Sequence, residues 1–209
     1  MTKRLDRRTL LILTAALALA SPALAAIPAS EPDDMTMGSA KAPVTLIEYA
    51  SASCPHCARF NNDVFPAFKK KYVDTGKVHY VFREFLTEPA QVAAAGFLVA
   101  RCGPPGQYFH VVDDFFHGQA EMYKTGDLRT LILAVAKKNG IASDKLEACF
   151  TDQAAADALN ARVKRHSEQG VDSTPTFVVN GTKLPDLDHE ANLADLDAAI
   201  QPLLKPGGR

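Results

Sequence analysis

Residues 44–57 read VTLIEYASASCPHC, an apolar, β-branched run followed closely by two cysteines. Residues 44–49 have the pattern of a buried strand. After the cysteines, apolar side chains recur at helical spacing as far as Phe68, and the run Lys69-Lys70-Lys71 suits the C-terminal end of a helix. The sequence therefore predicts a buried strand, a short loop and a helix that starts at the cysteine pair.

The segments on either side extend this unit into a mixed sheet. Residues 78–85 form a second β-rich run, and a strand, a helix and a strand in this order favour a right-handed parallel unit. The β pattern returns at residues 176–179, where Asn180-Gly181 indicates a hairpin to a further strand at residues 182–184. A last amphipathic helix is expected at residues 189–204.

Between the two β-rich parts, the period of the apolar residues changes to that of helices. Helices are expected at residues 89–102, 107–116, 128–139, 143–150 (with Ser143 as N-cap) and 153–169. The sequence thus predicts an α/β fold in which residues 44–87 and 171–209 build a mixed sheet with flanking helices. Residues 88–170 are expected to be a helical insertion, and residues 26–43 an extended lead-in.

Length and composition fit one globular domain. The 209 residues are 47% hydrophobic, 22% charged and 8% aromatic, which excludes a collagen-like, coiled-coil or disordered chain. Lys and Arg number 23 against 24 Asp and Glu. Because there is no basic surplus to neutralise phosphates, we expect no nucleic-acid partner.

Residues 1–25 have the three parts of a secretory signal peptide: a basic start, an apolar stretch at residues 10–20, and a small-x-small site that ends at Ala25. The apolar stretch is about half as long as the ~20 residues of a membrane-spanning helix, so we expect cleavage after Ala25 and a soluble mature protein. Arg7-Arg8 also resembles a twin-arginine motif, which leaves the general secretory and the twin-arginine routes both open. Either route leads to the periplasm, where disulfides form and persist.

Cys54-Pro55-His56-Cys57 is the candidate active site. The unpaired N–H groups and the positive dipole end at a helix start favour the thiolate of the first cysteine. We therefore expect Cys54 to be the attacking sulfur and the more enclosed Cys57 to resolve the mixed disulfide. Pro55 suits the first helical turn, and His56 adds a polarisable, partly cationic donor near Cys54. A stabilised thiolate makes the disulfide form a stronger oxidant.

Other interpretations of the cysteines fit less well. A zinc site needs a second close pair, but Cys102 and Cys149 are 47 residues apart, and neither has a metal-type neighbour at short spacing. A c-type haem site needs a histidine directly after Cys57, where the chain has Ala58. A purely structural disulfide between Cys54 and Cys57 stays open as an alternative. We expect no metal and no cofactor.

With its Cys54-Pro55-His56-Cys57 motif, and Thr174-Pro175 before the strand at residues 176–179, the chain resembles the DsbA family of exported thiol:disulfide oxidoreductases. That family has a thioredoxin fold with a helical insertion. The resemblance implies that Pro175 is a cis-proline facing the active-site disulfide and that Thr174 binds an extended substrate segment. It also implies that Glu48 is a buried acid beneath Cys57 and exchanges a proton with it. A strand residue with no role is the alternative for Glu48.

The resemblance further implies an enzyme that donates its Cys54–Cys57 disulfide to reduced, unfolded exported proteins. A quinone-linked, DsbB-like membrane partner is expected to reoxidise it. Thr174 stands where well-known oxidases carry valine and also occurs in isomerases and reductases, so these directions remain open. The isomerases dimerise through a separate N-terminal domain, which residues 26–43 are too short to form, and we therefore expect a monomer. A non-catalytic periplasmic chaperone or binding protein is a further alternative, in which the cysteine pair is only structural.

Cys102 and Cys149 fall within the predicted insertion. In the periplasm we expect them to form a structural disulfide, the pairing that leaves Cys54 and Cys57 free to cycle. A loop of this size stabilises a protein by roughly 3–5 kcal/mol in the chain-entropy model. Two reduced, buried thiols are the alternative.

Overall fold

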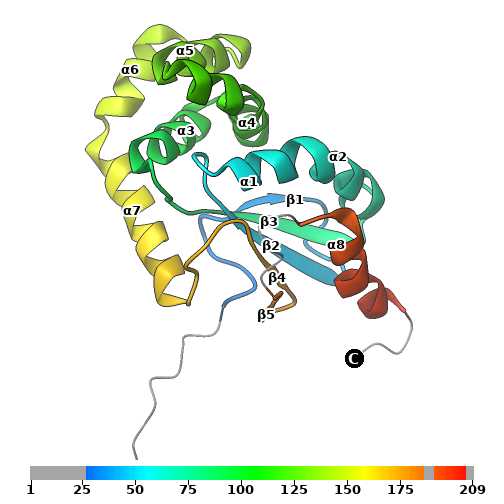
Figure 1. Cartoon of the computed structure of the whole chain (residues 1–209). Coiled ribbons are helices and arrows are strands. Elements are labelled where there is room, and N and C mark those ends of the chain that lie inside the picture. The colour runs from blue at the N-terminus through cyan, green and yellow to red at the C-terminus, as the bar shows by residue number, and fades with distance from the viewer. Residues whose placement is uncertain (1–26, 186–190, 206–209) are drawn as a thin grey trace, which may run out of the picture.

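A five-stranded mixed sheet forms the centre of the computed structural model within the part of the chain that it describes, residues 27–185 and 191–205 (Figure 1). The strands lie in the order β1-β3-β2-β4-β5. β2 and β3 run parallel, and the other neighbours run antiparallel. The predicted α/β class with a mixed sheet is confirmed. The strands are β1 (Met35–Met37), β2 (Val44–Ala50), β3 (Val78–Glu84), β4 (Thr176–Val179) and β5 (Thr182–Lys183).

One face of the sheet carries the helix that begins at the cysteine pair. The chain is helical from residue 55 to residue 73, through α1 (Pro55–Arg59), a π-helical segment (Phe60–Val64), α2 (Phe65–Phe68) and a second π-helical segment (Lys69–Val73). After β5, α8 (Leu193–Ile200) packs against α2 and continues into a 3-10 turn (Gln201–Leu204). The first two positions of the helix expected at residues 189–204 lie outside the described residues.

The helical insertion predicted between the two β-rich parts is present. Its helices are α3 (Ala90–Cys102), α4 (Tyr108–Thr125), α5 (Leu128–Lys138), α6 (Ser143–Thr151) and α7 (Gln153–Glu168). Figure 1 shows α3 to α6 stacked above α1 and the sheet, while α7 runs back beside the sheet. α4 packs against α1, so the insertion borders the start of the active-site helix. In the described ranges, none of the helices is both long and apolar enough to span a membrane.

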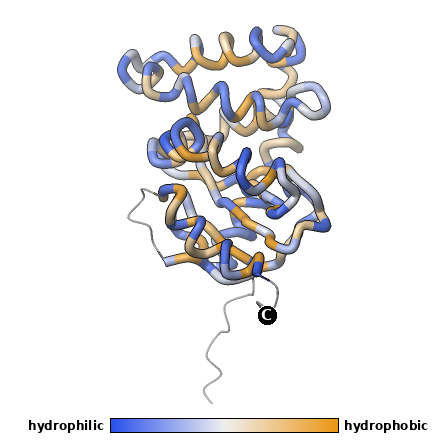
Figure 2. Tube along the Cα trace, turned by 90° about the vertical axis from the view of Figure 1, so that its right-hand side faces the viewer, coloured by the Kyte–Doolittle hydropathy of each residue, from blue (hydrophilic) through white to orange (hydrophobic). Residues whose placement is uncertain are grey.

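Alternation along β2 divides its side chains between the two faces of the sheet. Val44, Leu46 and Ala50 join the larger core, which includes residues of α1, α3 and α8. Ile47 and Tyr49 join a smaller core on the opposite face, to which α7 contributes. Glu48 alternates with the first set and is therefore directed toward the face that carries α1. Figure 2 shows hydrophobic and hydrophilic residues mixed along the helices at the top of the molecule.

α4 is longer than the helix expected at residues 107–116, so the predicted end is wrong. The helix runs on because Gln119 and Met122 are buried and hold the additional turns in place. Gly118 allows α4 to approach α5 closely, since a Cβ at this position would lie 2.2 Å from the Leu131 side chain. The helix ends at Gly126, which takes a left-handed conformation.

The predicted N-cap of α6 is also wrong. Ser143 is the first residue of the helix, and Ala142 holds the cap position without a side-chain hydrogen bond. The carbonyl oxygen of Ala142 accepts the first hydrogen bond of the helix, from the backbone N–H of Leu146 at 2.9 Å.

The segment before β2 does more than lead into the sheet. β1 pairs with β3 at the sheet edge, and the residues before β1 contact the side chain of Arg83, which is 1% exposed. Arg83 donates through Nε to Asp34 at 2.8 Å and through Nη1 to the Tyr49 hydroxyl at 2.8 Å. The predicted signal peptide, residues 1–25, lies outside the described residues.

Candidate active site

Cys54 lies at the N-cap of α1, at the end of the loop that leaves β2. Its Sγ accepts a hydrogen bond from the backbone N–H of Cys57 at 3.4 Å. Pro55 occupies the first turn, where its missing N–H leaves no helical bond unmade. Both cysteines are free thiols, and Cys54 is 6% exposed whereas Cys57 is fully buried. Of the two sulfur-bearing side chains, only that of Cys54 keeps contact with solvent.

The surroundings of Cys54 lower the pKa of its thiol to about 5. The largest cause is a hydrogen bond from the Cys57 thiol, and burial opposes it. The side chain of Thr174 and the backbone N–H groups of Cys57 and His56 lower the pKa further. His56 thus contributes through its main chain. At neutral pH, Cys54 is therefore a thiolate, which is the nucleophilic form.

Burial shifts the pKa values of Cys57 and Glu48 upward. The pKa of the Cys57 thiol lies well above its usual range because of burial, and interactions with Cys54 and Glu48 add to the shift. Burial also raises the pKa of Glu48 to about 8, against the lowering effect of a hydrogen bond from Tyr80. The charge on Cys54 raises this pKa further, so Glu48 lies within electrostatic reach of the sulfur pair. A carboxyl group that titrates near neutral pH is suited to both giving and accepting a proton.

The Thr174–Pro175 peptide bond is cis and leads into β4. The carbonyl oxygen of Thr174 accepts a hydrogen bond from the Cys54 thiol, with 3.3 Å between oxygen and sulfur. The Thr174 hydroxyl is buried and has no hydrogen-bond partner among the described residues. The Thr174 side chain nevertheless lies close enough to the sulfur to lower the pKa of Cys54. The fold thus brings Thr174 beside Cys54 across 120 positions of sequence.

Tyr80 belongs to the site, although the sequence analysis did not single it out. Its hydroxyl donates to Oε2 of Glu48 at 2.5 Å, and both side chains are buried. The register of the parallel strands explains the contact. Leu46 pairs with Tyr80 and Glu48 pairs with Phe82, so Tyr80 and Glu48 are diagonal neighbours on one face of the sheet. Only this register, which local sequence patterns do not contain, identifies the pair.

Two side chains of α4 hold the loop before the nucleophile, and no sequence pattern indicates them. Gln119 donates through Nε2 to the carbonyl oxygens of Ala52 at 2.7 Å and of Cys54 at 3.3 Å. Tyr123, one turn later, donates its hydroxyl to the carbonyl oxygen of Ser53 at 2.6 Å. The insertion thereby fixes three consecutive peptide groups next to the Cys54 sulfur.

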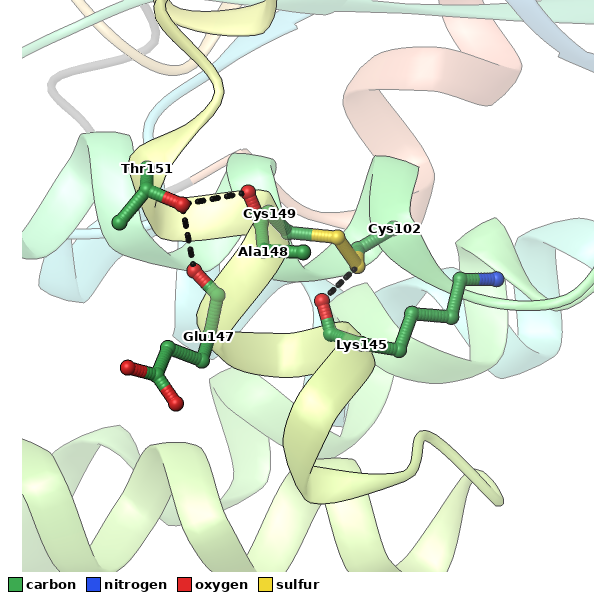
Figure 3. Close-up of a disulfide and its surroundings, with 6 residues drawn as sticks. All are labelled: Cys102, Lys145, Glu147, Ala148, Cys149 and Thr151. Atoms are coloured by element: carbon green, nitrogen blue, oxygen red, sulfur yellow. Dashed lines mark hydrogen bonds between the residues drawn. A yellow bond between two sulfur atoms is a disulfide. The ribbon is translucent and has the colours of Figure 1, made fainter.

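The second cysteine pair lies within the insertion. The structure joins Cys102, the last residue of α3, to Cys149 in α6 (Figure 3). Their Cα atoms are 6.0 Å apart, a usual separation for a disulfide. The carbonyl oxygen of Lys145 lies 3.6 Å from the Cys102 sulfur. This pairing leaves Cys54 and Cys57 available to each other.

The residues of this site support nucleophilic sulfur chemistry. Cys54 supplies an ionised nucleophile, Cys57 a second thiol within the same turn, and Glu48 a buried acid. Across residues 27–185 and 191–205, no group of three or more His, Cys, Asp or Glu side chains is arranged to hold a metal ion.

The chain is similar to known proteins over most of its length. The family model described as Thioredoxin matches residues 30–201. A solved structure, alpha-DsbA1 of Wolbachia pipientis, has a TM-score of 0.72 and 28% identity, over 83% of this chain and 92% of that one. BdbD from Bacillus subtilis has the same fold, with a TM-score of 0.70 and 21% identity over 82% of this chain and 92% of that one.

A relative from Rickettsia bellii carries the words protein-disulfide oxidoreductase in its name. It is 28% identical over 171 residues, which is 81% of this chain. The match spans 65% of the length of that relative.

Proposed function

This chain belongs to the thioredoxin family, and we propose that it is a DsbA-like thiol:disulfide oxidoreductase that donates its Cys54–Cys57 disulfide to reduced proteins. The observation that carries the proposal is the contrast between two neighbouring thiols. The pKa of Cys54 is lowered to about 5, whereas burial raises the pKa of Cys57 well above its usual range. One sulfur is therefore a ready nucleophile and leaving group, and the other is a protected partner that can close the disulfide.

In the proposed cycle, a client thiolate attacks Sγ of Cys54 in the oxidised pair. A client–Cys54 disulfide forms, the Cys54–Cys57 bond breaks, and Cys57 leaves with the electron pair. Glu48, as the neutral acid, gives its proton to the Cys57 thiolate. A second client thiolate then attacks the client sulfur of the mixed disulfide, and Cys54 leaves as a thiolate. The client thus gains a disulfide, and its two electrons pass to the enzyme's cysteine pair.

The low pKa of Cys54 favours the oxidising direction. A stabilised thiolate makes the reduced enzyme more stable, which raises the reduction potential of the pair. The hydrogen bond from the Cys57 thiol and the N–H groups at the start of α1 provide this stabilisation. The released enzyme therefore holds its two electrons more firmly than an ordinary dithiol does.

Client binding is proposed to use the backbone at Thr174. The Thr174 carbonyl oxygen lies beside the Cys54 sulfur, at the end of the loop that leads into β4. An extended client segment that pairs with the backbone of Thr174 by strand addition brings its own cysteine to Cys54. Pro175, fixed in the cis form, is proposed to pack on the disulfide in the oxidised enzyme.

The working cycle needs an oxidant outside this chain. We propose that the mature protein acts as a monomer in the periplasm and that a quinone-linked membrane partner reoxidises Cys54 and Cys57. Two measurements test this part. The exported protein is expected to begin at Ala26 by intact mass, and membranes containing quinone are expected to reoxidise the reduced protein.

The direct test of activity is refolding of a reduced, denatured disulfide-containing enzyme. The oxidised protein is expected to restore the activity of that enzyme, with one disulfide transferred per turnover. A Cys54→Ser variant is the control because it retains the fold but lacks the attacking sulfur. If the oxidised protein gives no gain over this variant, the proposal is wrong.

Thr174 supports a second candidate, a disulfide isomerase or reductase on the same fold. A threonine before this proline also occurs in such enzymes. The two candidates differ in what happens to the reduced protein. A reductase or isomerase is expected to resist reoxidation by membranes and to reshuffle scrambled disulfides, whereas an oxidase is expected to be reoxidised and to add disulfides to dithiols.

A further inference from the structure

Glu48 has one hydrogen-bond donor among the side chains that the structure describes, the hydroxyl of Tyr80. The distance from this hydroxyl to Oε2 is 2.5 Å, and Tyr80 is 3% exposed. The ring of Tyr80 is held independently of its hydroxyl, because it packs against Phe65 with 4.7 Å between the ring centroids and against Phe68 and Phe109. Removing the hydroxyl therefore removes one hydrogen bond and leaves the packing of the ring in place.

A second buried tyrosine–glutamate pair lies in the same core and differs from the first in the donors that surround its carboxyl group. The hydroxyl of Tyr108 donates to Oε1 of Glu84 at 3.0 Å. Arg101 and Arg162 also donate to Glu84, at 2.6 and 2.7 Å, so Glu84 has two cationic donors besides the hydroxyl. Glu48 has no such cation within ion-pair distance in the described part of the chain, and its one donor is a neutral hydroxyl. Replacing Tyr80 with phenylalanine therefore removes the one side-chain donor to Glu48 among the described residues, whereas Glu84 keeps two donors when Tyr108 is replaced.

The other titratable groups near the pair come from several elements. Cys54 and Cys57 act on it from the start of α1, and Tyr108 acts on Tyr80 from α4. On β4, the residue paired with Glu48 is Phe177, which does not titrate. Tyr80 also lines a cavity of about 540 Å³ between α2, α4 and β1, to which Lys69, His110 and Asp113 contribute.

We propose that Tyr80 is a positioning residue for the proton-transfer step, because its hydrogen bond stabilises the carboxylate form of Glu48 and leaves the other carboxyl oxygen to carry the proton exchanged with Cys57. This inference rests on the proposed function and extends it. The sign follows from the geometry, since a donor to Oε2 bonds more strongly to the carboxylate than to the neutral acid. Without the hydroxyl, Glu48 holds its proton to higher pH and is a poorer acceptor for the proton of Cys57.

The hydrogen bond from Tyr80 to Glu48 affects the step in which the Cys54–Cys57 disulfide closes. With oxidised glutathione as oxidant, the Cys54 thiolate attacks one glutathione sulfur, and the other glutathione leaves as a thiolate. Cys57 then loses its proton to the Glu48 carboxylate, and its thiolate attacks Sγ of Cys54. The Cys54–glutathione bond breaks as the Cys54–Cys57 bond forms, and the second glutathione leaves with the electron pair. The pH profile of this second step therefore reports the ionisation of Glu48.

The test compares Tyr80→Phe with the wild type in stopped-flow reoxidation by excess oxidised glutathione over a range of pH. For the wild type, the closing step is expected to accelerate as Glu48 ionises. The midpoint is expected below the pKa of about 8 that Glu48 has beside the charged Cys54, because Cys54 carries no charge in the mixed disulfide. In Tyr80→Phe this midpoint is expected to rise by roughly one pH unit, the size that a charge-assisted hydrogen bond brings, so that the rate below the midpoint falls about tenfold. The pKa of the Glu48 carboxyl group is expected to rise by the same amount. Carbon NMR measures it, with the signal assigned by its loss in Glu48→Gln.

Tyr108→Phe is the matched control, because it deletes a buried tyrosine hydroxyl that donates to a glutamate already held by two arginines. It is expected to leave the midpoint unchanged. A site-specific fluorotyrosine at position 80, a stronger donor, is expected to move the midpoint down and keeps the test available if Tyr80→Phe folds poorly. If Tyr80→Phe follows the wild-type profile, or if Tyr108→Phe shifts as much, the inference fails while the proposed function stands. If the wild-type pair does not cycle with glutathione at all, the proposed function fails.

Discussion

Cys54 and Cys57 have the same side chain and lie three residues apart, but their surroundings shift the pKa values of the two thiols in opposite directions. Cys54 lies at the N-cap, where N–H groups point at its sulfur, while Cys57 is enclosed in the core and interacts electrostatically with Glu48. The Cys57 thiol is also the largest cause of the low pKa of Cys54. A single hydrogen bond between the two side chains therefore contributes to both shifts.

Replacing Cys57 with alanine removes that hydrogen bond. The pKa of Cys54 is expected to rise from about 5, while the backbone N–H of Cys57 still lowers it. The ultraviolet absorbance of the thiolate, followed against pH, measures the change. Cys57→Ser is the control, since its hydroxyl keeps a donor at the same place and is expected to restore most of the lowering. An unchanged midpoint in Cys57→Ala would contradict the assigned cause.

Glu48 is expected to link stability to pH. Its pKa is about 8 in the folded protein against an ordinary value of 4.5, so its contribution to stability is full below pH 4.5 and is lost as the pH rises through about 8. Glu48→Gln does not titrate. Relative to the wild type, this variant is expected to become steadily more stable between those two pH values and to keep a constant advantage above them.

Denaturant unfolding of the oxidised protein, in which neither active-site cysteine titrates, measures this difference. Because the Cys54 charge that helps to raise the pKa of Glu48 is absent there, the change is expected to end below pH 8. Glu121→Gln neutralises an exposed glutamate of α4 and serves as the control. Parallel stability curves for Glu48→Gln and the wild type would show that the acid ionises in the folded protein as it does in the unfolded one.

β3 connects the site around Cys54 to the N-terminal segment. Its residue Tyr80 faces Glu48, and three residues later Arg83 faces the segment before β1. Arg83 is buried with Asp34, and the Asp34 side chain is 5% exposed. Such a pair adds little when intact, because both charges lose their hydration, but removing one partner leaves the other charge buried and poorly compensated.

Asp34→Ala is therefore expected to lower the free energy of unfolding by about 3 kcal/mol. The Tyr49 hydroxyl, the Pro28 carbonyl oxygen and the more distant Glu31 remain near Arg83 and limit the loss. The exposed pair of Lys69 and Asp74 supplies the control, Asp74→Ala, for which a much smaller loss is expected. Equal effects of the two substitutions would show that the segment before β1 does not anchor Arg83.

The Cys102–Cys149 disulfide fixes α6 to the end of α3 within the insertion. Replacing both cysteines with alanine is expected to lower the free energy of unfolding by roughly 2–4 kcal/mol, mainly by releasing the unfolded chain from a closed loop. Denaturant unfolding without reductant measures the loss. The double variant Cys54→Ala/Cys57→Ala, which lacks the other pair, is the control and is expected to lose less. Equal stability with and without Cys102 and Cys149 would contradict a structural role.

The sequence predicts those features of the fold that depend on local patterns. The β-branched run at residues 44–49, the helix after Pro55 and the Asn180-Gly181 hairpin each contain their own signal. Both hairpin residues have positive φ, as this turn requires. The class of fold, the mixed sheet and the helical insertion follow from such patterns and from the resemblance.

Features of the structure that depend on tertiary contacts could not be predicted from local sequence patterns. The three-residue strand β1 is too short to produce a recognisable β pattern in the sequence. It forms by pairing with the unpaired edge of β3. α4 continues beyond Gly118, where the close approach of the Leu131 side chain leaves no room for a Cβ. Tyr80 and Gln119 reach the site through strand register and helix docking over 32 and 67 positions of sequence. No single-sequence pattern records such distant pairs.

We propose that the fold as a whole stabilises the reduced form of the Cys54–Cys57 pair, a thiolate and a thiol. The sheet buries Glu48 within electrostatic reach of the pair, α1 presents its N–H groups to Cys54, and α4 fixes the loop that precedes Cys54. The reduction potential of the Cys54–Cys57 pair, obtained by equilibration with glutathione redox buffers and intact mass after alkylation, measures this result directly. We predict a value closer to the strongly oxidising ~−120 mV than to ~−270 mV. A value at or below ~−270 mV, typical of a thioredoxin-like reductase, would contradict the account.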